Sequence, residues 1–141
     1  MTFPSPIYGL LLNKFVLSAW IKVEHSMEES HAAYAQRLIE AVLTSPGDTE
    51  PSVRKAVEAL SAQPGGRLSS QTNAFPPELI SYVKKIALHA YKTTDEDIES
   101  LHKAGYSEDA IFEITVSAAP GTSMARLERG LAVSGAKGDE E

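Results

Sequence analysis

Hydrophobic residues from position 27 onward recur every three or four residues, which is the spacing of one face of an α-helix. The segments that carry this spacing are separated by turn-forming Pro and Gly residues. The sequence lacks strict alternation of apolar and polar residues beside an Asn-Gly or Asp-Gly turn, which would predict paired strands. The pattern therefore predicts an all-α domain, a compact arrangement of about six helices.

Capping and breaking residues set the expected limits of these helices. Ser26 and Glu29 have the spacing of a capping box and predict a helix over 27–44, which ends before Pro46. Gly105 is expected to take the left-handed conformation that joins two later helices. The remaining helices are expected to begin near these residues: Pro51, Pro77, Thr93 or Thr94, and Ser107.

The last long apolar segment is expected to be buried at first and then interrupted. Apolar residues over 110–119 cover nearly the whole circumference of a helix, which predicts a central position. Pro120-Gly121 is expected to kink or break that helix. An amphipathic segment over 122–133 should follow, with three side chains facing inward: Met124, Leu127 and Leu131.

The same pattern divides the chain into an N-terminal arm or helix over 1–26, a helical domain over 27–134, and an acidic disordered tail over 135–141. The apolar stretch in the arm is interrupted at Asn13 and Lys14, so it falls short of the roughly 20 residues of a membrane-spanning helix. No basic segment precedes it, as one would in a signal peptide. We therefore expect a cytoplasmic protein without a membrane partner.

Charge and cysteine content remove several classes of function. A formal net charge of -6 with scattered basic residues argues against nucleic-acid binding, which depends on clustered Lys and Arg. The 141 residues include no cysteine, which excludes disulfides, thiolate metal ligands and thiol-based catalysis. The chain is therefore expected to work without thiol redox chemistry.

Two Glu-x-x-His pairs, Glu28 with His31 and Glu99 with His102, have the spacing found in carboxylate-bridged metal sites. Such a site also needs a carboxylate from each of two further long helices, whereas Glu99 lies on a short one. His31 falls within the apolar stripe of its helix and is expected to be a hydrogen-bonded core histidine. We therefore expect no metal and no cofactor.

The helix after Pro77 presents four groups suited to proton transfer along one edge of its apolar stripe. They lie at offsets of 0, 4, 7 and 11, and are Glu78, Tyr82, Lys85 and His89. On the residues alone a structural explanation is stronger: Glu78 complements the dipole at the start of the helix, and the others form a solvated border. These four residues are the candidate catalytic site.

From residue 78 to about residue 133, the sequence resembles the alkylhydroperoxidase D-like and carboxymuconolactone decarboxylase superfamily. The clearest likeness lies over residues 101–114, which read LHKAGYSEDAIFEI, and over residues 125–131, which read ARLERGL. The resemblance implies the alkylhydroperoxidase D-like helical fold and assembly into a homo-oligomer, with pockets near subunit contacts.

The peroxidase branch of that superfamily carries a Glu followed, after eleven residues, by Cys-x-x-Cys-x-x-x-His. Counted back from Gly105, this motif places its glutamate at Glu78, its cysteines at Ala90 and Thr93, and its histidine at Asp97. Only the glutamate matches, so thiol peroxidase activity is not expected. The decarboxylase branch uses acid–base groups, and the nearest histidine here is His89.

Three functions follow from these observations. The first is that of a non-redox small-molecule-binding protein, or a degenerate member of the superfamily without catalysis. The second is an acid–base enzyme of lyase or isomerase type that uses Glu78 and His89 on a small carbonyl or lactone substrate. The third is an oligomeric interaction protein without a small-molecule site. A pocket beside the helix after Pro77 would favour the first two, whereas side chains packed into that space would favour the third.

Overall fold

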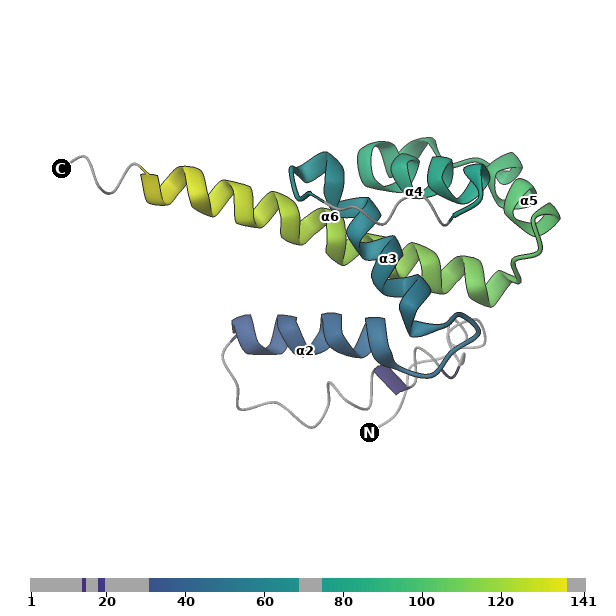
Figure 1. The fold of residues 1–141 in the computed structure, drawn as a ribbon, viewed down its shortest axis with the longest axis horizontal. Helices are drawn as coiled ribbons and strands as arrows, with labels where there is room; N and C mark the ends of the chain where they lie inside the picture. Colours follow the sequence, from purple (N-terminus) through teal and green to yellow (C-terminus); the bar gives the residue numbers. More distant parts are fainter. Residues whose placement is uncertain (1–13, 15–17, 20–30, 69–74, 137–141) are drawn as a thin grey trace.

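A computed structural model of the chain describes residues 14, 18–19, 31–68 and 75–136. These residues form five α-helices and two 3-10 turns and contain no strand, which confirms the all-α prediction at the level of fold class. Figure 1 shows α3 crossing α6, with α2 on one side of this crossing and α4 and α5 on the other. Within the described residues, no helix is long and apolar enough to cross a membrane.

The first two described helices are joined by a short Pro-Gly loop. Helix α2 spans His31–Thr44 and α3 spans Pro51–Ala62, with Pro51 in the first position, where the missing N–H group costs nothing. A 3-10 turn over Gln63–Gly65 follows α3. The expected start of α2 near residue 27 and the expected arm over 1–26 fall almost wholly outside the described residues.

Helix α4 spans Pro77–His89, continues into a 3-10 turn over Ala90–Lys92, and is followed by α5 over Asp95–Lys103. Thr94 and Asp97 form a capping box at the start of α5, in which each side chain meets the backbone of the other residue. Gly105 has a φ of 99°, which confirms the left-handed conformation expected there.

Helix α6 spans Glu108–Ala136 as one continuous helix of 29 residues, so the expected break at Pro120 is wrong. Gly121 explains the position of the Pro-Gly pair, because a Cβ atom there would overlap the backbone oxygen of Glu58 on α3. The Thr122 hydroxyl donates to the carbonyl oxygen of Ser61, 3.0 Å away. The pair therefore marks a close helix crossing instead of a helix end. Residues 108–136 therefore form one helix where the sequence predicted two segments.

The hydrophobic core lies between α3, α4, α5 and the first half of α6. Its fully or almost fully buried members are Val57, Leu60, Leu79, Tyr82, Val83, Leu101, Ile111, Ile114 and Ala118. Each buried aliphatic side chain of this size contributes about 1.5–3 kcal/mol relative to an exposed one. The apolar stripe expected on α4 comprised Leu79, Tyr82, Val83, Ile86 and Ala90. Its first three members are buried and Ile86 is half-buried, but Ala90 is exposed beyond the end of the helix.

The second half of α6 differs from its expected packing. Met124 is half-buried, but Leu127 is 51% exposed and Leu131 is 62% exposed, so their expected inward position is wrong. Every residue from Arg126 to Gly135 is exposed. The helix therefore runs past the edge of the core, as Figure 1 shows on the left, and we call residues 126–135 the α6 overhang.

Candidate functional site

Two of the four candidate residues on α4 have their polar atoms bound to neighbouring helices. The Tyr82 hydroxyl lies 2.7 Å from the hydroxyl oxygen of Thr115 on α6. The Lys85 ammonium lies 2.7 Å from both carboxylate oxygens of Asp97 on α5. Burial raises the pKa of the Tyr82 phenol above its ordinary value. These contacts hold α4 against its neighbours.

The other two candidates lie at opposite ends of α4. Glu78 is exposed in the first turn of the helix, and His89 is exposed at its last residue. The pKa of Tyr106, which is raised mainly by burial, is raised further by the charge of Glu78. Tyr82 and Lys85 therefore contact Thr115 and Asp97. The structure does not bring the four candidate residues of α4 together in one site.

Three residues occupy the positions that the family motif gives to two cysteines and a histidine. Ala90 is exposed at the start of the 3-10 turn after α4. The Thr93 hydroxyl oxygen is buried and has no hydrogen-bond partner among the described residues. Asp97 accepts hydrogen bonds from Lys85 and from the backbone of Thr94, and these lower the pKa of its carboxyl group. A carboxylate thus pairs with Lys85 at the position of the motif histidine.

A second polar cluster, which the sequence interpretation did not find, lies between α3, α6 and the loop after α2. Arg54 and Glu113 are both completely buried, and a guanidinium nitrogen of Arg54 lies 3.5 Å from a Glu113 carboxylate oxygen. Burial lowers the pKa of Arg54, while the negative charge of Glu113 opposes that shift. A buried charge of either sign is costly unless it is paired, so each residue requires the other.

The loop over residues 45–50 completes this cluster. The backbone N–H groups of Asp48 and Thr49 donate to the Glu113 carboxylate at 2.8 and 2.7 Å, and the Thr49 hydroxyl donates at 2.5 Å. Arg54 in turn donates to the carbonyl oxygens of Thr49 and Ser45. The two charged side chains therefore satisfy the backbone of the loop and fix α2 against α6.

Gly47 allows the loop to approach this closely, because a Cβ atom there would lie 2.5 Å from a carboxylate oxygen of Glu113. A signal for the cluster is present in the sequence: Glu113 is a lone charge in the apolar run Ala110-Ile-Phe-Glu-Ile, and a charge in a buried helix needs a cation. We assign the cluster a structural role, since its polar groups are directed at the backbone of the same chain.

The described residues contain no group of three or more His, Asp or Glu side chains that could hold a metal ion. His31 is exposed at the start of α2, so its expected place in the core is wrong. Glu99 pairs with Lys103 at 3.7 Å on the surface of α5, and a ring nitrogen of His102 lies 3.0 Å from the carbonyl oxygen of Tyr106. Glu28 lies outside the described residues.

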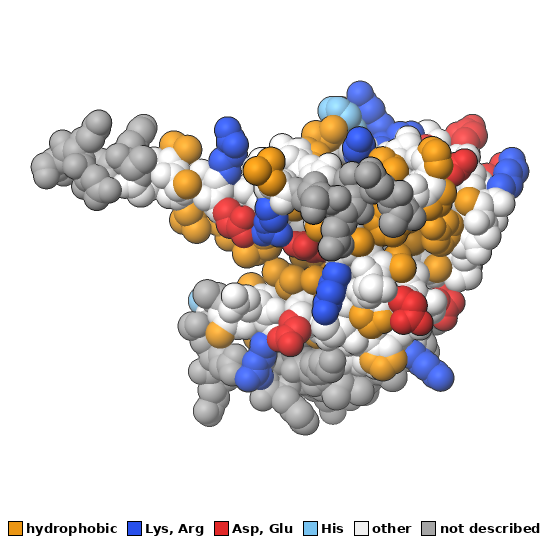
Figure 2. Space-filling model, in the orientation of Figure 1, with side chains coloured by type: hydrophobic (Ala, Val, Ile, Leu, Met, Phe, Trp, Pro, Cys, Tyr) orange, Lys and Arg blue, Asp and Glu red, His pale blue; other side chains and the backbone are white. Residues whose placement is uncertain are grey.

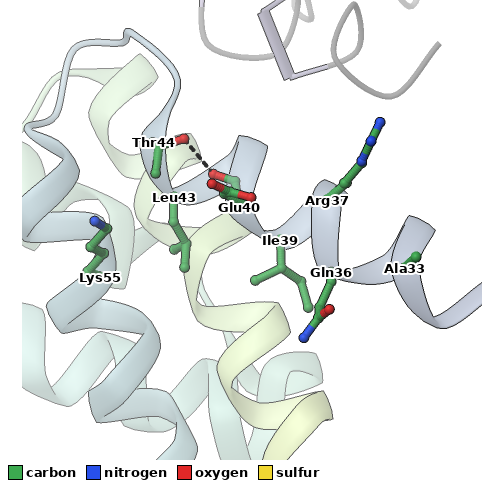
Figure 3. Close-up of a pocket in the computed structure, with 8 residues that line it drawn as sticks. All are labelled: Ala33, Gln36, Arg37, Ile39, Glu40, Leu43, Thr44 and Lys55. Carbon is green, nitrogen blue, oxygen red and sulfur yellow. Dashed lines mark hydrogen bonds between the residues drawn. The ribbon is translucent and has the colours of Figure 1, made fainter. Parts of the chain in front are cut away.

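An open groove of about 640 Å³ runs along α2 and reaches α3. Its lining combines apolar and charged side chains: Ala33, Gln36, Arg37, Ile39, Glu40, Leu43, Thr44 and Lys55. In Figure 3, Ile39, Leu43 and Gln36 point toward the side where the yellow-green ribbon of α6 passes, while Arg37 points away from it. We call this feature the α2 groove.

The α6 overhang turns an apolar face toward the α2 groove. Pro120, Met124, Leu127 and Leu131 lie 7, 11, 14 and 18 residues after Glu113, so all five side chains share one face of the helix. Glu113 meets the loop at the end of α2, and the same face therefore continues along α2. Figure 2 shows the molecule hollowed between the overhang and α2, with hydrophobic side chains along the α6 side.

In comparisons with known proteins, no family model, no curated protein and no solved structure matches this chain.

Proposed function

We propose that the chain is an oligomeric interaction protein that binds through the α2 groove and the α6 overhang. The observation that carries this proposal is the apolar face of the overhang: Leu127 and Leu131 are 51% and 62% exposed and stand across from an open groove. Single exposed leucines are ordinary on protein surfaces. Here they continue one helical face beside a groove with Ile39 and Leu43 in its lining, which is the form of a docking surface.

Helix energetics support the same proposal. A helix that is already nucleated can extend past its packed part, but the extension is only marginally stable in water where its side chains gain no packing. The overhang, residues 126–135, is exposed throughout, although Arg126 donates to the Ala87 carbonyl oxygen and Glu128 pairs with Arg67. A partner packed against its apolar face would supply the stabilisation that the core of its own chain does not.

The packing around α4 favours an interaction protein over an enzyme. Leu79, Tyr82 and Val83 pack directly into the core on the inner side of α4. The polar groups of Tyr82 and Lys85 are used in holding helices together, and Glu78 and His89 lie in solvent. The inner face of α4 is thus used for packing among the described residues, which supports an interaction protein over an enzyme.

We also propose that the chain is a cysteine-free relative of the alkylhydroperoxidase D-like superfamily, as its resemblance over residues 78–133 implies. The left-handed Gly105 between α5 and α6 supports this relationship, whereas Asp97, which pairs with Lys85, departs from the histidine of the motif. Assembly into homo-oligomers, which the resemblance implies, agrees with the proposed docking surface. Thiol peroxidase activity is not part of this proposal, because positions 90 and 93 carry Ala and Thr.

A second candidate function, small-molecule binding with or without proton transfer, is favoured by the buried, unpartnered hydroxyl of Thr93. This oxygen lies three residues after Ala90 and one before the capping residue of α5, close in sequence to the partner of Lys85. Native mass spectrometry of protein purified without added ligand tests this candidate. A bound small molecule that is lost in Lys85→Gln but kept in Lys84→Gln would favour it over the interaction protein.

The proposed interaction surface is tested by the mass of the protein in solution. Wild-type protein at roughly 50 µM is expected to sediment as a particle heavier than the 15.2 kDa chain. Leu127→Asp should reduce the mass to that of one chain, because a charge would have to be buried at the contact. Leu88→Asp is the matched control, since Leu88 is 50% exposed on α4 and outside the surface. A wild-type protein of one chain at this concentration would overturn the proposal.

A further inference from the structure

We infer that the partner at this surface is a second copy of the same chain, with the α6 overhang of each copy seated in the α2 groove of the other. This inference rests on the proposed function and specifies its partner. The chain carries both halves of the contact: a protruding helix with an apolar face, and an open groove whose lining includes Ile39 and Leu43. A contact in which each copy gives a helix and receives one closes on itself through a two-fold axis, and leaves neither half exposed.

The direction of the helices determines how such a dimer is arranged. In Figure 1, α6 runs out from the core above α2, and the two helices run in opposite directions. A second overhang that enters the hollow from the open side runs antiparallel to the first. The two overhangs then lie side by side in the middle, and each is also in contact with α2 of the other copy. The result is a four-helix arrangement, built from α2 and α6 of both chains, that covers Leu127 and Leu131.

Because the chain has no cysteine, single introduced cysteines report the contact directly. Ile39→Cys and Leu131→Cys proteins, one of them isotopically labelled, are mixed and oxidised with oxidised glutathione. A disulfide between positions 39 and 131 of different chains is expected, because this bond requires Cα atoms within about 7 Å. Leu43→Cys in place of Ile39→Cys is a second variant for the same face. Leu88→Cys mixed with Leu131→Cys is the control and should not form a mixed dimer.

The outcomes separate this inference from the proposed function. Two results would overturn the exchange of helices but leave the interaction protein standing, provided that wild type associates. In the first, Leu131→Cys chains form disulfides only with one another. In the second, a chain that carries both substitutions forms the disulfide within itself. If wild type is a single chain, both are overturned.

Discussion

At the scale of single residues, Glu113 and Arg54 contribute to stability through the loop that they hold. Neither side chain reaches solvent, and between them they bind backbone groups of Ser45, Asp48 and Thr49. Replacing a whole buried ion pair by apolar residues can be neutral, but removing one partner leaves a buried charge uncompensated. The position of α2 therefore depends on this pair being complete.

Glu113→Gln is expected to lower the free energy of unfolding by about 3 kcal/mol. The amide cannot neutralise Arg54, and its NH₂ group would face the N–H donors of the loop. Urea denaturation measures the loss, with Glu99→Gln as the control. Glu99 is paired with Lys103 on the surface, so that change should stay within about 0.5 kcal/mol. Similar losses in the two variants would show that the buried pair is not needed.

The pairing of Asp97 with Lys85 predicts a specific acid sensitivity. The hydrogen bond from Lys85, followed by that from the Thr94 backbone, holds the pKa of Asp97 below its unfolded value of about 4. The stabilisation is therefore fully present above that value and is lost as the pH falls through the lower folded pKa. The stability difference between wild type and Asp97→Asn should be constant near neutral pH and shrink below about pH 4.

Urea midpoints measured from pH 7 to pH 2 check this prediction. Asp95→Asn is the matched control, because it removes a carboxylate from the same first turn of α5 and leaves the bond to Lys85 in place. A wild-type curve that falls with acid no faster than that of Asp97→Asn would contradict the assigned role of the pair.

At the α4 site, the sequence predicted where Tyr82 and Lys85 lie on the helix but did not predict which residues they contact. Its offsets correctly placed Tyr82 and Lys85 at the margin of a buried face, and both are at least partly buried. Their partners, Thr115 and Asp97, come from α6 and α5, and helical spacing within α4 carries no information about them. Apolar periodicity does not reveal Glu113, because the apolar residues on either side of it produce the same helical pattern with or without a charge. Its position as a lone charge in that apolar run is the signal for a buried partner.

At the scale of helices, the crossing of α3 and α6 determines the shape of the fold. Gly121 permits the contact, since any side chain there would meet the backbone of Glu58 and the hydroxyl of Ser61. The sequence correctly predicted the starts of α3, α4, α5 and α6 from Pro, Thr and Ser signals. It misjudged Pro120, because proline breaks a helix by local sterics, whereas packing against α3 keeps this one continuous.

Gly121→Ala is expected to destabilise the protein by about 2 kcal/mol, because the added methyl group must displace the backbone of α3. Gly130→Ala is the control at a helical glycine of α6 with open space around it. That change should be neutral or stabilise by up to about 1 kcal/mol, since alanine favours helix. Thermal unfolding at one protein concentration compares the two. Equal melting temperatures would mean that the helices do not cross this closely.

At the scale of the whole molecule, the unexpected exposure of Leu127 and Leu131 is the informative difference between sequence and structure. Helical spacing correctly put both leucines and Met124 on one face, but it could not specify what that face meets. The core ends near Ala125, which is buried, and the helix continues beyond it. The apolar pattern of residues 124–131 fits a contact that a second chain would complete.

Amide hydrogen exchange over the α6 overhang, residues 126–135, tests the central claim most directly when it is measured at two protein concentrations. If a second chain covers the overhang, its amides should exchange slowly at roughly 100 µM and faster at roughly 1 µM, as dilution separates the copies. Residues 110–118 of α6, which lie in the core, should exchange slowly at both concentrations. Rapid exchange of the overhang at both concentrations, next to a protected first half of α6, would contradict the account.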